Sequence, residues 1–68
     1  MTKRFFDEEL RIWRKKKKLN QRRLADILEV GIVTIWRWEK GIQRPSKLAL
    51  NRLKQVGFFW NDEERFSG

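Results

Sequence analysis

Hydrophobic residues recur at helical spacing in short runs along this chain, and no run alternates as a β-strand would. Three apolar helical faces are visible, formed by Leu24, Ala25 and Leu28, by Ile35 and Trp38, and by Leu50 and Leu53. We therefore predict an all-α fold, a compact bundle of five helices or of four helices and a tail. Its 68 residues are enough for a single domain, residues 1–68, with a small core.

The first helix is predicted over residues 7–18, after an N-terminal arm of residues 1–6. Asp7 can cap it, acidic residues occupy its first turn and lysines its last, as the helix dipole prefers. Leu10 and Trp13 are expected to face inward. The expected outward positions are Arg11, Lys15 and Lys18.

Two further helices are joined by a tight turn. Asn20 is a good cap for a helix over residues 21–28, and Gly31 can cap the next helix, residues 32–39. A helix pair of this kind, held at a steep angle, presents its second helix to the major groove of DNA.

Glycine and proline set the remaining bounds. Gly41 follows the second helix of the pair where a left-handed closing residue is wanted. Pro45 breaks the pattern before a fourth predicted helix, residues 46–56, and Gly57 stops it. An aromatic and acidic tail, residues 57–68, completes the chain.

The chain is strongly basic, with 17 Lys and Arg against 9 acids and a net charge of +8. Residues 61–68 contribute three acids and one arginine, a net of −2, so residues 1–60 carry +10. Such a charge attracts polyanions, with phosphate backbones as the first candidate and anionic membrane surfaces as the second. A solvated basic surface that serves solubility is the alternative.

The absence of cysteine and histidine removes several kinds of chemistry. Thiolate and imidazole metal sites and Cys–His nucleophiles are excluded, and no hydroxyl has an evident base, so we expect no enzyme, no metal and no cofactor. No apolar stretch approaches the roughly 20 residues that span a bilayer, and the N-terminus turns acidic before a signal core. We therefore expect no membrane partner and a cytoplasmic protein.

Two sequence motifs carry a family resemblance. They are Leu19-Asn20-Gln21-Arg22-Arg23-Leu24-Ala25 and Thr34-Ile35-Trp36-Arg37-Trp38-Glu39-Lys40-Gly41, with Arg44-Pro45-Ser46 after them. In this register they resemble the Cro/C1-type (Xre-family) helix-turn-helix domain of phage repressors and bacterial regulators, over residues 10 to about 56. The resemblance implies a lambda-repressor-like bundle that binds double-stranded operator DNA, usually as a homodimer.

The sequence departs from the family pattern at three places. The family usually has glycine near Lys18 and at Glu29, where the chain turns with positive φ, and another residue there costs about 1 kcal/mol. Many relatives also carry polar base-reading residues where this chain has Ile32 and Val33.

The candidate base-reading residues are Val33, Thr34, Arg37 and Ile32. With Ile35 in the core, rotation by about 100° per residue points Val33 and Arg37 away from the core. Arg37 can donate two hydrogen bonds to guanine, whereas Val33 and Ile32 can pack on thymine methyl groups. Both could instead pack on the preceding helix or a partner chain. We favour DNA for Val33 and packing for Ile32.

The candidate phosphate-binding residues are Gln21, Arg22, Lys40, Arg44, Lys47 and Trp36. Gln21 stands in the first turn of its helix, where free N–H groups favour an anion, and in the family this glutamine commonly holds a phosphate. Its alternative is a plain polar position. Trp36 can lie on the sugar–phosphate backbone or shield the helix from a second subunit. The lysine run 15–18 can add contacts, although such runs are usually solvated.

A structural ion pair is implied by the same resemblance. Glu39 matches the family glutamate that pairs with an arginine of the first helix, here Arg14. Trp13 and Trp38 are expected to be core residues, because a domain this small needs large apolar groups.

The predicted function is a sequence-specific transcriptional regulator, a repressor of prokaryotic or phage origin acting on a pseudo-palindromic operator. The alternative is an antitoxin-type DNA-binding protein whose tail binds a toxin through Phe58, Phe59 and Trp60. That patch could instead be a hydrophobic plug or a homodimer contact. The other candidate dimer contact is Trp36 with the loop 40–44.

Overall fold

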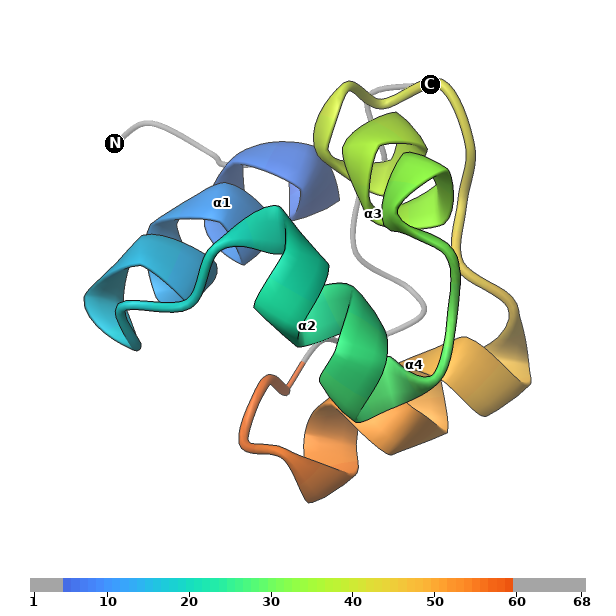
Figure 1. Cartoon of the computed structure of the whole chain (residues 1–68). Helices are drawn as coiled ribbons and strands as arrows, with labels where there is room; N and C mark the ends of the chain where they lie inside the picture. Colours follow the sequence, from blue (N-terminus) through green and yellow to red (C-terminus); the bar gives the residue numbers. More distant parts are fainter. Residues whose placement is uncertain (1–4, 60–68) are drawn as a thin grey trace.

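The computed structural model describes residues 5–59, which form four helices joined by short connections (Figure 1). The helices are α1 (Phe6–Lys16), α2 (Gln21–Leu28), α3 (Ile32–Glu39) and α4 (Lys47–Gln55). Within residues 5–59 there is neither a strand nor a fifth helix. The all-α bundle expected from the hydrophobic spacing is therefore confirmed in its four-helix form. Trp60 and the acidic residues of the tail lie outside the described residues.

Helix α2 is the centre of the arrangement. It packs against α3 on one side and α4 on the other, and α1 packs against α3 (Figure 1). The core between the helices is formed by Phe6, Leu10, Leu24, Ala25, Leu28, Ile35, Trp38, Leu50, Leu53 and Phe58. Trp13 and Leu19 pack against this core while partly buried. The apolar faces of all four helices thus meet in one cluster.

The predicted bounds of the first helix were wrong at both ends. Phe5 occupies the N-cap without a capping side chain, so Asp7 lies in the first turn and does not cap the helix. The helix includes Phe6 because its ring is buried in the core, 2% exposed. It ends at Lys16, two residues before the predicted end, because Lys18 adopts a left-handed conformation with φ 59°.

The fourth helix is slightly shorter than predicted. Ser46 is its N-cap and not its first residue, and its Oγ accepts a hydrogen bond from the Ala49 N–H at 3.1 Å. The helix ends at Gln55 and Val56 is the C-cap. A cap residue lies half outside its helix, which accounts for the one-residue difference at each end.

The aromatic segment after α4 is divided between the core and the surface. Phe58 is 5% exposed and contacts the rings of Phe6 and Trp13 edge-on, at centroid distances of 5.6 and 5.5 Å. Phe59 is 75% exposed. Phe58 is therefore the hydrophobic plug that we gave as the alternative to a toxin contact, because burying its ring closes the core between α1 and the end of α4.

Candidate nucleic-acid interface

The turn between α2 and α3 is fixed by local hydrogen bonds. At the start of α2, the Asn20 side chain accepts from the Arg23 N–H at 2.7 Å, as expected of an N-cap. At its end Glu29 is left-handed, with φ 58° and ψ 43°, and Val30 N–H donates to the Ala25 carbonyl at 3.0 Å. Gly31 then caps α3 in an extended conformation. Glu29, Val30 and Gly31 therefore form the whole turn between the end of α2 and the start of α3.

Helix α3 has one buried and one open face. Ile35 is fully buried and Trp38 is 2% exposed, so this side of α3 lies on the core. On the other side Val33 is 54% exposed and Arg37 is also exposed. Thr34 is half-buried on the flank. The predicted base-reading residues are therefore brought together on the outer side of the second helix of the pair.

Ile32 and Trp36 extend this outer side. Each is 43% exposed, one turn apart on the helix. About half of Ile32 is covered and about half is open, so its packing against α2 or a partner chain, which we favoured from the sequence, stays a prediction.

A buried network holds α3 against α1 and α2. The Arg14 guanidinium donates to both carboxylate oxygens of Glu39, from Nε at 2.6 Å and from Nη2 at 3.0 Å. Glu39 is 2% exposed. Arg14 also donates from Nη1 to the Leu19 carbonyl at 2.9 Å, so the one side chain ties together α1, the loop before α2 and the end of α3.

Gln21 joins the same network from the first turn of α2. Its Nε2 donates to Oε1 of Glu39 at 3.1 Å, which orients the amide beside the helix N-terminus. A glutamine amide has a second N–H on the same nitrogen, and that hydrogen can still be donated to an anion. Glu39 thus positions a residue proposed for phosphate binding as well as α3 itself.

Two structural arginines were not found from the sequence. Arg11, expected to face outward, is half-buried, and its Nη1 donates to the Glu39 carbonyl. Arg52 of α4 donates to the Leu28 carbonyl at 2.9 Å, where α2 ends. Both satisfy carbonyls at helix C-termini, which have no partner within their own helix. The sequence offers no signal for these pairs, because they join residues 28 and 24 positions apart.

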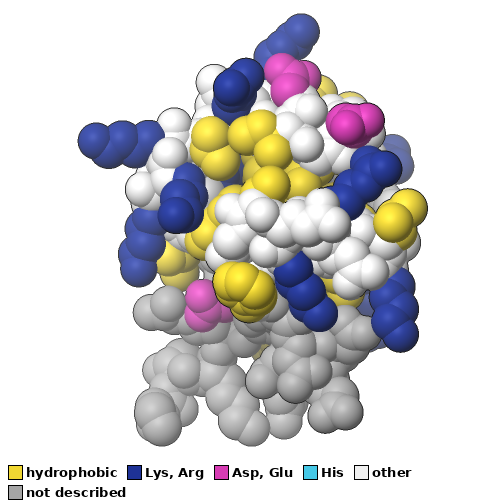
Figure 2. All heavy atoms as spheres, turned by 90° about the horizontal axis from the view of Figure 1, so that it is seen from below, with side chains coloured by type: hydrophobic (Ala, Val, Ile, Leu, Met, Phe, Trp, Pro, Cys, Tyr) yellow, Lys and Arg dark blue, Asp and Glu magenta, His cyan; other side chains and the backbone are white. Residues whose placement is uncertain are grey.

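Exposed cations precede and follow α3 along the chain. They are Arg22 at the start of α2, Lys40 and Arg44 after α3, and Lys47 at the start of α4. Viewed from the α4 side, Lys and Arg side chains lie on several sides of the described surface, with a few Asp and Glu side chains among them (Figure 2). The net charge by itself therefore does not single out one face for a polyanion.

Within residues 5–59 no helix is long and apolar enough to cross a bilayer. No three acidic side chains in that part of the chain are grouped so that they could hold a metal ion.

Comparison with known proteins agrees with this geometry. A family model described as helix-turn-helix matches residues 10–55, which contain α2, the turn and α3 entirely. Searches of curated proteins and of solved structures each gave no match. The match covers most of the chain and includes the two motifs. The chain belongs to the Cro/C1-type (Xre) helix-turn-helix family of DNA-binding transcription regulators.

Proposed function

We propose that this regulator is a sequence-specific repressor of prokaryotic or phage origin that binds a pseudo-palindromic operator, including one in its own promoter. The observation that carries the proposal is the outer side of α3, where Val33 and Arg37 are exposed one turn apart. The helix is backed by the buried Arg14–Glu39 pair. A rigid helix with an open face is what direct readout in the major groove requires.

In this proposal base reading and phosphate binding are divided between different residues. Arg37 donates two hydrogen bonds to a guanine, and Val33 packs on an adjacent thymine, with Thr34 and Ile32 beside them. Phosphates are bound by Gln21 at the helix N-terminus and by surrounding groups, namely Arg22, Lys40, Arg44, Lys47 and Trp36. Only the four cations of this list, with up to two lysines of the run 15–18, can neutralise phosphates. Log K is then expected to fall against log salt with a slope of roughly −4 to −5 per monomer.

The test is binding of the purified chain to its own upstream DNA at two salt concentrations, with Arg37→Ala beside it. We expect tight, sequence-dependent binding that Arg37→Ala weakens by about 1–3 kcal/mol, mostly at one G·C pair. Lys54→Ala is the matched control, because Lys54 is an exposed cation in the last turn of α4, at the far end from the loop after α3. Weak binding that ignores sequence and is indifferent to Arg37 would leave only a basic surface.

The homodimer has a test of its own. Two-fold dimers of helix-turn-helix proteins bind half-sites about one helical turn apart. Inserting about five base pairs between the half-sites puts them on opposite sides of the duplex. We therefore expect cooperative binding to be lost, whereas an insertion of about ten base pairs should partly restore it. Equal binding to all three spacings would mean that each half-site is occupied by an independent monomer.

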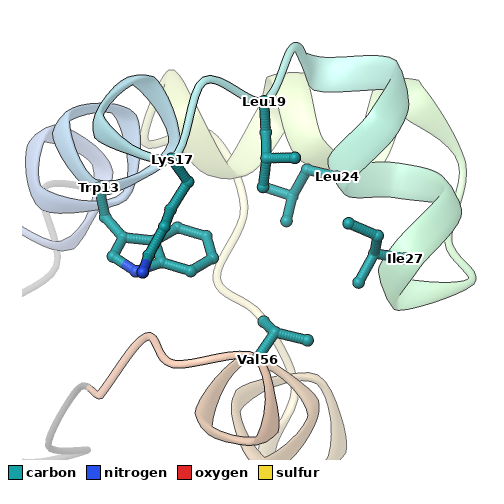
Figure 3. A pocket seen from close by; sticks show the side chains of 6 residues that line it. All are labelled: Trp13, Lys17, Leu19, Leu24, Ile27 and Val56. Carbon is teal, nitrogen blue, oxygen red and sulfur yellow. The ribbon is translucent and has the colours of Figure 1, made fainter.

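A second candidate function is an antitoxin-type regulator, and the exposed ring of Phe59 favours it. Phe59 borders a shallow groove that is also lined by Glu9, Ile12, Trp13, Lys16 and Phe58. A second groove of about 250 Å³ lies on the other side of Trp13, between α1, α2 and the end of α4 (Figure 3). Its other lining residues are Lys17, Leu19, Leu24, Ile27 and Val56. Apolar grooves of this kind can accept side chains of a protein partner.

Co-expression with the product of the adjacent gene tests this alternative. A toxin should form a stable complex with the chain, and Phe59→Ser or Ile27→Glu should weaken it while leaving operator binding intact. Leu48→Ser is a control, since Leu48 is exposed but lines neither groove. A neighbouring protein that neither binds the chain nor inhibits growth would end this candidate.

A further inference from the structure

The outer side of α3 is unusually apolar for a surface that faces DNA. Ile32, Val33 and Trp36 are 43%, 54% and 43% exposed and come from adjacent turns of one helix. Trp36 lies four positions after Ile32 and three after Val33, so its side chain adjoins both on the helix surface. We call these three residues the apolar triad. In the structure of residues 5–59, about half of each of the three stays open.

Hydrogen-bonding groups are few beside the triad. Within α3, Thr34 is half-buried, Trp36 has a single indole N–H, and Arg37 is the exposed residue that can donate two hydrogen bonds to one base. Arg37 stands one turn after Val33, so a base pair that it contacts adjoins the triad. A surface with one strong donor and three apolar groups can distinguish one guanine by hydrogen bonds. Further discrimination along the groove must come from apolar contact.

The apolar group that the major groove offers is the methyl group on C5 of a pyrimidine. Thymine carries it and uracil and cytosine do not, whereas 5-methylcytosine has the same methyl on the same ring atom. The aliphatic side chains of Ile32 and Val33 have neither a donor for thymine O4 nor an acceptor for the cytosine amino group. They therefore respond to the methyl group more than to the identity of the pyrimidine.

We propose that Ile32 and Val33 of the apolar triad bind C5-methyl groups of pyrimidines next to the guanine held by Arg37, while Trp36 adjoins them on the side of the sugar–phosphate backbone, so that 5-methylcytosine substitutes for thymine in the operator. The proposal rests on the proposed function, because it names the chemical group that the same helix reads. It makes operator affinity sensitive to cytosine methylation. Burying one methyl group changes affinity about fourfold.

The experiment uses the full chain and an operator duplex obtained by selection from random DNA. Each thymine of a half-site is replaced in turn by deoxyuridine, by cytosine and by 5-methylcytosine, with the complementary base adjusted for the last two. At positions touched by the triad we expect deoxyuridine to weaken binding about fourfold. At the same positions 5-methylcytosine should bind about fourfold more tightly than cytosine.

Val33→Ser connects the effect to the triad. Val33 is 54% exposed, so the variant retains the core, and its thymine-to-deoxyuridine affinity ratio should fall toward one at a single position. Leu48→Ser is the matched control, because Leu48 is a 63% exposed apolar residue on α4 and its removal should leave every ratio unchanged.

The outcomes separate this inference from the proposed function. Specific operator binding with a thymine-to-deoxyuridine ratio near one at every position would overturn the inference and leave the proposed function intact. The inference would also be overturned if the thymine-to-deoxyuridine affinity ratio stayed the same in all three variants, Val33→Ser, Ile32→Ser and Trp36→Ala. The methyl group would then act through DNA shape. Failure of selection to enrich any sequence would instead overturn the proposed function.

Discussion

At the scale of single residues, two charged side chains stand where the backbone takes the left-handed conformation. Lys18 has φ 59° in the loop between α1 and α2, and Glu29 has φ 58° at the end of α2. A side chain with a Cβ is strained there, whereas glycine is not. Gly41 and Gly57 occupy the other left-handed positions, with φ 73° and 106°. The positive φ at residues 18 and 29 explains why glycine is expected there. This chain keeps the left-handed conformation at both positions but has lysine and glutamate instead of glycine.

We expect Lys18→Gly and Glu29→Gly each to stabilise the protein by about 1 kcal/mol, because each removes left-handed strain from an exposed position. In a domain of this size that corresponds to roughly 4–8 °C in Tm. Urea unfolding followed by circular dichroism measures the effect. Lys15→Gly is the control: Lys15 is exposed within α1, and glycine there should destabilise by about 1 kcal/mol. Destabilisation by both glycine variants would contradict the strain argument.

At the scale of elements, the position of α3 depends on three side chains from two other helices, α1 and α2. Arg14 reaches Glu39 from α1 and Gln21 reaches it from α2, while Arg11 donates to the Glu39 carbonyl at the helix end. All three contacts converge on Glu39, the last residue of α3. The orientation of α3 is therefore set at its buried C-terminal end.

Removing the Glu39 carboxylate should destabilise the protein strongly. Glu39→Ala leaves the Arg14 guanidinium, 11% exposed, without its partner, and the expected cost is about 3–5 kcal/mol. Because this can unfold the chain, the double variant Arg14→Met with Glu39→Leu is made alongside. It removes both charges, and we expect it to recover much of the lost free energy of unfolding. If Glu39→Ala lost less than about 1 kcal/mol, the pair would behave like a surface ion pair.

At the scale of the whole molecule, the chain after α4 completes the core. Phe58 N–H donates to the Leu53 carbonyl at 2.9 Å, and the ring then enters between Phe6 and Trp13. Residues near both ends of the described chain are thus joined by an aromatic contact. Phe59, the next residue, is directed to the surface. The core of this small domain is closed only when the segment after α4 is in place.

Truncating these two neighbouring aromatic side chains should have very different effects. Phe58→Ala should cost about 3–5 kcal/mol, because it leaves a cavity in the core, whereas Phe59→Ala should change stability by less than about 0.5 kcal/mol. Phe58→Leu keeps most of the volume and should lie between them. Thermal unfolding of the three variants is the measurement. Equal losses at residues 58 and 59 would show that the ring of Phe58 does not close the core.

The sequence alone was sufficient for the features that depend on near neighbours. Hydrophobic spacing predicted α2 and α3 with the bounds that the structure shows, and Asn20 caps α2 as predicted, through the N–H of a residue three positions away. Motif residues in register also predicted the family. These signals survive in the sequence because helix periodicity and capping act over one turn.

Only the tertiary structure decided which distant groups meet. Phe58 is buried and Phe59 exposed although both are phenylalanine, and no periodicity separates them. The bonds of Gln21 and Arg11 to Glu39 join residues 18 and 28 positions apart, so they follow from how α1, α2 and α3 pack. The helices are specified locally by side-chain type and spacing. The surface they present is specified by packing, because burial depends on what the rest of the chain places beside each residue.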